Sequence, residues 1–379
     1  MSGLEFDSTG TIVEGYNGTD KHVVIPEGVV GIANGAFRSN YSIEEVSLPS
    51  TLKKIGIGAF AYCNALKVIS IPESVEQIGG NAFAYTAIQK TDINWLKTIP
   101  ENLFEGCASL ESADISGARS IEQMAFLACK ALKNVNFGAV EIIGESAFAG
   151  CDSLVLRSLP ESLKVLGPQA FSNFPNGMIM PKSVEKIGGK CLGLYYKGRK
   201  ITIYKSLLYE FREYFRNGEN RYNAYEPISM EITVLDNLTG AVVDFIPLYC
   251  EWNFDTIVSI IRNFKQDNTF DYVSYDRNIW GKRLKDKDSK LTIACMRLKH
   301  PYGLKDDYRE DYSKYVSRYL KEVARDAIKN RDIDMLAAIY ENKIFNNKTI
   351  KEALDFSITV DATECTAYLL NCQSNMKNK

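Results

Sequence analysis

The residues of this sequence that could do nucleophilic chemistry are Cys295 and His300, which lie five positions apart. A thiol beside an imidazole serves as nucleophile and base when a third group orients the imidazole. The sequence offers no evident third group, so a structural cysteine and a surface histidine are the favoured interpretation. Phosphate-loop, dinucleotide-binding, zinc-protease and paired-cysteine motifs are absent. We therefore expect no enzyme activity, and keep a hydrolase within residues 227–300 as a further alternative.

The nine cysteines could instead bind a metal or form disulfides. Side chains that stand in one line on stacked units point in parallel, which suits neither disulfide geometry nor tetrahedral zinc. We therefore expect free, buried thiols, no structural metal and no cofactor. Four cysteines follow a phenylalanine, at the same point of a repeat, by three positions: Cys63, Cys107, Cys129 and Cys151.

That repeat organises the first half of the chain. An Ala-Phe pair, replaced once by Leu103-Phe104 and at the end by Lys190-Cys191, returns every 20 to 23 positions. A period in this range with Leu and Ile at fixed offsets is typical of a leucine-rich-repeat solenoid. One such unit cannot bury its apolar face alone, so neighbouring units must stack. The pairs are Ala36-Phe37, Ala59-Phe60, Ala82-Phe83, Ala125-Phe126, Ala147-Phe148 and Ala170-Phe171.

The pattern is clearest in the unit that begins at Leu66, where Ile69 and Ile71 complete a Leu-x-x-Leu-x-Leu strand. With the following Ile-Gly corner and Ala-Phe pair, it resembles the BspA-type leucine-rich repeat, IPxSVxxIGxxAFxxCxxL, over about residues 20–194. The middle of the repeat region departs from this pattern, with Ile99-Pro100 at one glycine corner and no strand-ending proline at Asn136-Phe137-Gly138. Such repeats occur in cell-surface and host-interaction proteins and in many bacterial proteins. The resemblance therefore implies a binding role.

The sequence predicts an α+β repeat protein: a right-handed leucine-rich-repeat solenoid, a small α+β segment and a helical C-terminal module. The expected parts are the solenoid at 1–194, its C-terminal cap at 195–226, the α+β region at 227–300 and the helical module at 301–379. In the cap, Ile201 and Ile203 give a last strand. Residues 230–235 and 241–246 alternate around a glycine turn and predict a hairpin, whereas residues 253–264 predict an amphipathic helix.

From residue 304 onward, apolar residues recur at helical spacing. Asn330, Asn347 and Asp361 stand where helix N-caps are expected. Short helices in antiparallel pairs resemble ankyrin repeats, although the Thr-Pro-Leu-His signature is absent. A plain helical bundle is the alternative.

The candidate binding residues lie on the repeat strands. Side chains alternate along a strand between the core and the outer face, which is the concave face in such a solenoid. The middle of the outward row is polar, with Val68 and Leu156 expected to flank it with apolar contact. The alternative is that these polar residues only keep the sheet soluble. The predicted partner-binding residues are Lys90, Asp92, Ser112, Asp114, Asn134 and Asn136.

The bulk composition limits the partners. A net charge of −2 provides no positive electrostatic potential that would attract nucleic acid. No apolar run reaches the length of a membrane span. We expect a protein-protein interaction scaffold, cytoplasmic if the chain is complete. The alternative is a cell-surface or secreted adhesin that binds a host protein or glycan and has lost an N-terminal signal.

Overall fold

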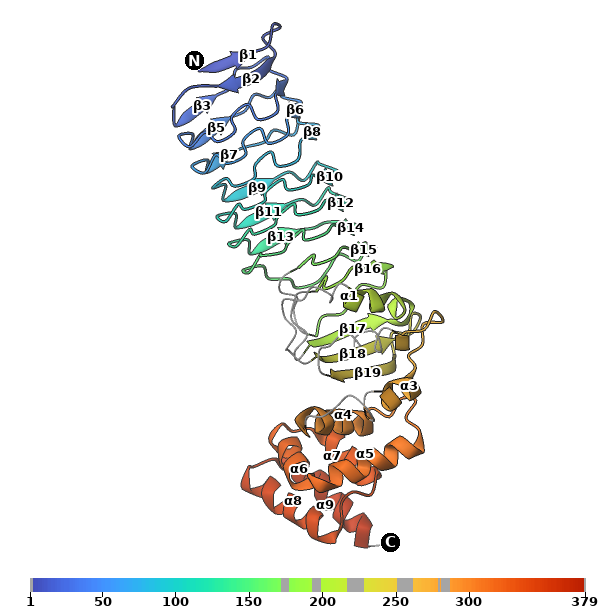
Figure 1. The fold of residues 1–379 in the computed structure, drawn as a ribbon. Coiled ribbons are helices and arrows are strands. Elements are labelled where there is room, and N and C mark those ends of the chain that lie inside the picture. Colours follow the sequence, from blue (N-terminus) through green and yellow to red (C-terminus); the bar gives the residue numbers. More distant parts are fainter. Residues whose placement is uncertain are drawn as a thin grey trace. The chain divides into compact units, whose positions relative to one another are not determined.

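The computed structural model describes residues 3–171, 177–192, 199–216, 228–250, 262–278, 280 and 287–377. Contacts divide the chain into two compact units, Met1–Tyr195 with Ile201–Asn220 and Tyr196–Lys200 with Arg221–Lys379. The first unit is the predicted leucine-rich-repeat solenoid, and the helices of the second follow it in the chain (Figure 1). The four-part division expected from the sequence stays a prediction, as does the ankyrin-like character of the last part.

Most coils of the solenoid carry two short strands, one in each of two ladders of parallel pairs, whereas the last two coils carry only a second-ladder strand among the described residues (Figure 1). An N-terminal hairpin, β1 (Leu4–Phe6) with β2 (Ile12–Tyr16), precedes them, and β2 pairs with β4. The first ladder contains β3 (His22–Val24), β5 (Glu45–Ser47), β7 (Val68–Ile69), β9 (Lys90–Asp92), β11 (Ser112–Asp114) and β13 (Asn134–Asn136). The second contains β4 (Gly31–Ile32), β6 (Lys54–Ile55), β8 (Gln77–Ile78), β10 (Thr98–Ile99), β12 (Ser120–Ile121), β14 (Ile142–Ile143), β15 (Val165–Leu166) and β16 (Lys186–Ile187).

The core of the solenoid is a column of stacked phenylalanines, one from each of seven successive coils. Successive ring centroids lie 4.8 to 5.7 Å apart with nearly parallel planes. All the rings are buried, which confirms the column that the Ala-Phe repeat predicts. Its members are Phe37, Phe60, Phe83, Phe104, Phe126, Phe148 and Phe171.

Both ladders are interrupted between the coil of residues 64–86 and the coil of residues 87–107. Strand β7 does not pair with β9, and β8 does not pair with β10. We call this junction the seam. Elsewhere the residue after the second-ladder strand donates its N–H to the preceding coil, as from Gly79 to the Ile55 carbonyl (2.8 Å). Pro100 takes that position at the seam and has no N–H to donate.

The coils on the two sides of the seam remain joined near the phenylalanine column. Three backbone N–H groups of the first coil, on Asn81, Phe83 and Tyr85, donate to carbonyls of the second coil over 2.7 to 3.1 Å. The connection from Phe83 to the next core residue, Ile88, is one residue shorter than that from Phe60 to Leu66. The departure that the sequence shows at Pro100 therefore coincides with an opening of the sheets and not with the end of a domain.

The solenoid ends in strand β17 (Arg199–Tyr204), followed by the short helices η1 (Lys205–Leu207), η2 (Glu210–Arg212) and α1 (Glu213–Arg216). Thr202 exchanges backbone hydrogen bonds with the preceding coil, through the Met178 carbonyl and the Met180 N–H. Ile201, Ile203 and the apolar residues of η1, η2 and α1 are buried. These residues shield the last coil from water, as the cap of a solenoid must.

The second unit begins with an antiparallel hairpin of β18 (Ile228–Leu235) and β19 (Val242–Cys250), which confirms the predicted hairpin. The helix expected over residues 253–264 lies largely outside the described residues. The helices that follow are α3 (Tyr272–Asn278), α4 (Lys287–Lys299), α5 (Asp306–Arg318), α6 (Leu320–Lys329), α7 (Ile333–Glu341), α8 (Asn347–Thr359) and α9 (Thr363–Lys377).

The caps of the last helices differ from those predicted. Asp332 caps α7, and Asn346 caps α8 in a capping box with Thr349. Asn330 instead ends α6, and Asn347 is the first residue of α8, so both N-cap predictions were wrong. Helix α9 begins at Thr363, two positions beyond Asp361. The sequence offers an acceptor one or two positions from each true cap, and the helix register decides which one is used.

Candidate functional site

The six predicted binding residues lie together on three adjacent strands of the first ladder. Strand register aligns them in two rows across the sheet, one of Lys90, Ser112 and Asn134 and one of Asp92, Asp114 and Asn136. All six line one hollow of about 560 Å³, which Ile69 and its neighbours close on the β7 side. We call these six side chains the polar face.

Local hydrogen bonds orient the second row. The Asn136 side-chain amide donates to Asp114 Oδ2 over 3.2 Å, and the Ser116 N–H donates to Asp114 Oδ1 over 3.0 Å. Hydrogen bonding by the Ser116 side chain foremost, followed by the Ser116 N–H and the Asn136 amide, lowers the pKa of Asp114, so its carboxylate is ionised at neutral pH. Lys90, Asp92 and Asn134 are exposed. The face therefore offers a partner hydrogen-bond donors and acceptors, and side chains of both positive and negative charge.

The apolar flank of the polar face is present on one side only. Val68 is 53% exposed on β7 but does not line the hollow, whose apolar side is formed by Ile69 and Ile71, and Leu156 is only 6% exposed. The expectation for Leu156 was wrong because its coil forms no strand at this point. Arg157 stands where the other coils place an inward residue, and an unpaired guanidinium is too costly to bury. Arg157 turns outward instead, so Leu156 turns inward and Val155 is exposed.

The cysteines of the repeat have a structural role that their spacing alone did not reveal. Each thiol donates to the backbone carbonyl of the phenylalanine in the preceding coil, as from Cys63 to Phe37 (3.0 Å) and from Cys107 to Phe83 (3.1 Å). Burial raises the pKa of Cys63 and of Cys107 to about 11. The eight cysteines whose side chains are described form no disulfide, and Cys250 lies outside that set.

The model of one family matches this arrangement of repeats. The model of the BspA-type leucine-rich repeat region matches residues 30–155 and 97–223, with six copies of the repeat. Together the two matches span just over half of the chain. The chain belongs to the BspA-type leucine-rich-repeat family. Strands β4 to β17, the polar face and the phenylalanine column all lie within the matched residues.

Solved structures of leucine-rich-repeat proteins are similar to parts of the chain. One from Bacteroides ovatus is 26% identical over 52% of this chain and 64% of its own, with a TM-score of 0.36. One from Eubacterium ventriosum is 26% identical over 46% of this chain and 50% of its own, with a TM-score of 0.42. A leucine-rich cell surface protein from Faecalibacterium prausnitzii is 25% identical over 50% of this chain and 55% of its own, with a TM-score of 0.30.

The chain thus spans about two thirds or less of the length of these three proteins. No curated protein matches it. None of the helices that the structure describes combines the length and the apolarity that crossing a membrane requires.

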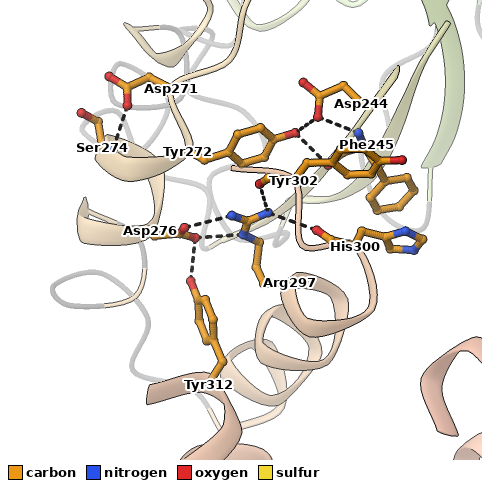
Figure 2. A network of polar contacts seen from close by, with 10 residues as sticks. All are labelled: Asp244, Phe245, Asp271, Tyr272, Ser274, Asp276, Arg297, His300, Tyr302 and Tyr312. Carbon is orange, nitrogen blue, oxygen red and sulfur yellow. Dashed lines mark hydrogen bonds and ion pairs between the residues drawn. The ribbon is translucent and has the colours of Figure 1, made fainter. Parts of the chain in front are cut away.

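Beyond the BspA-type repeats, the second unit holds a buried ion pair that sequence reasoning missed (Figure 2). The guanidinium of Arg297 binds both carboxylate oxygens of Asp276 over 3.0 Å, and both side chains are fully buried. Arg297 also donates to the carbonyls of His300 and Tyr302, and the Tyr312 hydroxyl donates to Asp276 over 2.7 Å. These bonds satisfy the pair internally, so it locks the packing of α3, α4 and α5.

The network continues to the hairpin through Tyr272. Its hydroxyl donates to Asp244 and to the Phe245 carbonyl, while its ring lies 4.4 Å from the Arg297 guanidinium carbon (Figure 2). Asp276 and Arg297 lie 21 positions apart in a part of the sequence without a repeat. No local sequence pattern could therefore have predicted this ion pair.

Cys295 and His300 do not form the activated pair that nucleophilic chemistry needs. Burial raises the pKa of Cys295 to about 12, so its thiol stays protonated. The His300 ring stacks on Phe245 at 3.7 Å, and burial lowers its pKa to about 4. No hydrogen bond joins the two side chains within the described part of the chain. Across the same residues, no group of His, Cys, Asp and Glu side chains is suited to hold a metal ion.

Proposed function

We propose that this BspA-type chain is a non-enzymatic interaction protein that binds a protein partner on the polar face. The observation that carries the proposal is the single hollow of about 560 Å³ that all six residues line. Three strands in register present these side chains at fixed spacing. Because the backbone of the site is already ordered, binding costs little conformational entropy there. The raised pKa of Cys295 argues against nucleophilic catalysis by that thiol.

The alternative is an adhesin at the cell surface that binds a host protein or glycan through the same face. A pull-down from native lysate, set beside a pull-down from host-cell extract, separates the two by the source of the captured molecule. A partner found only in lysate supports the interaction scaffold. One found only in host extract supports the adhesin.

The test of the face is a triple variant, Asp92→Ala with Asp114→Ala and Asn136→Ala, measured for affinity to the captured partner by calorimetry. Central side chains of an interface are worth about 2 kcal/mol or more each, so we expect at least ~30-fold weaker binding. The matched control removes one amide and two carboxylates that are exposed outside the hollow: Gln77→Ala, Asp152→Ala and Glu161→Ala. Equal affinity of a folded face variant and the control would refute the proposal.

A further inference from the structure

The seam leaves strand β9 with a free edge. Strand β9 pairs with β11 on one side, but on its other side β7 makes no pair with it. The first ladder is therefore two separate three-stranded sheets, β3-β5-β7 and β9-β11-β13 (Figure 1). A strand edge without a partner is a template for adding another strand, and folded proteins normally cover or disrupt it.

The backbone groups that face this edge can be identified. Gln89 accepts from the Glu111 N–H over 2.8 Å, and Ile93 donates to the Asp114 carbonyl over 3.0 Å, so both point toward β11. Alternate residues of a strand direct their backbone groups to opposite sides. Lys90 and Asp92 therefore point their N–H and C=O groups away from β11, into the seam, where the structure gives them no backbone partner.

The same edge opens onto the polar face. Ile69 and Ile71, on the far side of the seam, line the same hollow as Lys90 and Asp92. The seam is less open at the second ladder, where the Trp95 indole N–H donates to the Val75 carbonyl over 2.9 Å. At the first ladder, no side-chain hydrogen bond among the described residues joins β7 to β9. The free edge of β9 is thus the accessible part of the seam.

The side chains beside this edge favour a cationic ligand. Asp92 and Asp114 are aligned on adjacent parallel strands, which brings equivalent residues to about 5 Å from one another. Lys90 is the single positive side chain that lines the hollow. The hollow therefore carries a net negative charge, which the guanidinium or ammonium group of a partner would complement.

We propose that β9 accepts an extended segment of the protein partner as an added strand, with one Arg or Lys of that segment seated on Asp92 and Asp114. The inference rests on the proposed function, since it specifies what the partner presents to the polar face. Main-chain hydrogen bonds to Lys90 and Asp92 supply affinity, and the basic side chain supplies specificity, as in other cases of strand addition.

The test uses synthetic octapeptides, acetylated and amidated at their ends, with seven random positions and one Arg or Lys. They are screened against the full chain, and the affinities of selected peptides are measured by fluorescence anisotropy. We expect selected peptides to bind, and to lose at least about tenfold in affinity when alternate backbone amides are N-methylated. The opposite set of amides should tolerate methylation.

A pair of variants tests the protein side of the same bonds. Lys90→Pro removes the N–H that faces the seam, whereas Lys90→Ala removes the same side chain and keeps the N–H. A proline is tolerated on an edge strand whose N–H has no partner, so we expect the fold to persist by circular dichroism. Lys90→Pro should bind the peptides at least about tenfold more weakly than Lys90→Ala does, because the two variants differ in the backbone N–H and not in the loss of the Lys90 side chain. If Lys90→Pro fails to fold, the methylated peptides decide alone.

The basic side chain is tested with Asp92→Asn and Asp114→Asn together, and with norleucine in place of the peptide's Arg or Lys. Each change should weaken binding, and the two together should add little to either one. The inference is overturned if no octapeptide binds with a Kd below about 1 mM. It is also overturned if Lys90→Pro binds the peptides as tightly as Lys90→Ala and the methylated peptides bind as tightly as the unmethylated ones. The proposed function would survive that result, because it depends on the triple variant and the captured partner.

Discussion

Replacing Phe148 by alanine tests whether the phenylalanine column holds the solenoid together. Phe148 is 1% exposed and stacks between Phe126 and Phe171, with centroid distances of 5.1 and 5.3 Å. Phe137 packs edge-on against the same ring at 5.4 Å. The substitution therefore removes three aromatic contacts at once and leaves a cavity in the core.

The expected loss in the free energy of unfolding is about 4 kcal/mol. Truncation of a buried phenylalanine costs about 3–5 kcal/mol, and each aromatic pair adds about 0.5–1.5 kcal/mol beyond the area buried. Phe6 provides a matched control because it is 37% exposed and lies outside the column. Phe6→Ala should cost less than about 1 kcal/mol.

Urea unfolding followed by far-ultraviolet circular dichroism gives both values from the shift in midpoint at equal slope. A loss below about 1 kcal/mol for Phe148→Ala, or equal losses for the two variants, would show that the column does not carry the stability assigned to it.

Three further predictions concern the buried polar and sulfur groups. Asp276→Ala leaves the Arg297 guanidinium buried without its partner and should cost about 3–5 kcal/mol, whereas adding Arg297→Met should recover part of that loss in the same urea assay. A further loss in the double variant would contradict this account. Because the folded pKa of His300 is about 4 against an ordinary 6.5, the unfolded chain binds the proton first, and stability should fall as pH falls between these values. His300→Leu should flatten that decline. An unchanged pH profile of this variant would show that protonation of His300 does not cause the loss of stability. Cys63 and Cys107, with pKa values near 11, should react slowly with a disulfide reagent at pH 8, while the denatured chain without reductant should titrate nine thiols. A shortfall of two thiols that reduction restores would indicate a disulfide.

The sequence was sufficient for the features that repeat. A fixed period places Phe83 and its equivalents in one column, and strand alternation places Asp92 and Asp114 side by side, because both depend only on spacing. The prediction that Leu156 points outward was wrong because it assumed the same strand alternation in a coil whose inward position holds Arg157.

Other features depend on contacts that spacing does not encode. The missing N–H of Pro100 is visible in the sequence, but the parting of β7 from β9 on the other ladder is not. The pairing of Asp276 with Arg297 joins two helices of a segment without periodicity, so only the folded chain brings the residues together.

The seam has a consequence for how the solenoid unfolds. In a stack of repeats, stability is approximately a sum of intrinsic coil stabilities and nearest-neighbour interfaces, so cooperativity is only as strong as the weakest interface. The junction after residue 86 lacks the ladder hydrogen bonds of both sheets and keeps those beside the column. The coils before it and after it should therefore behave as two foldons, with distinct opening free energies in native-state hydrogen exchange.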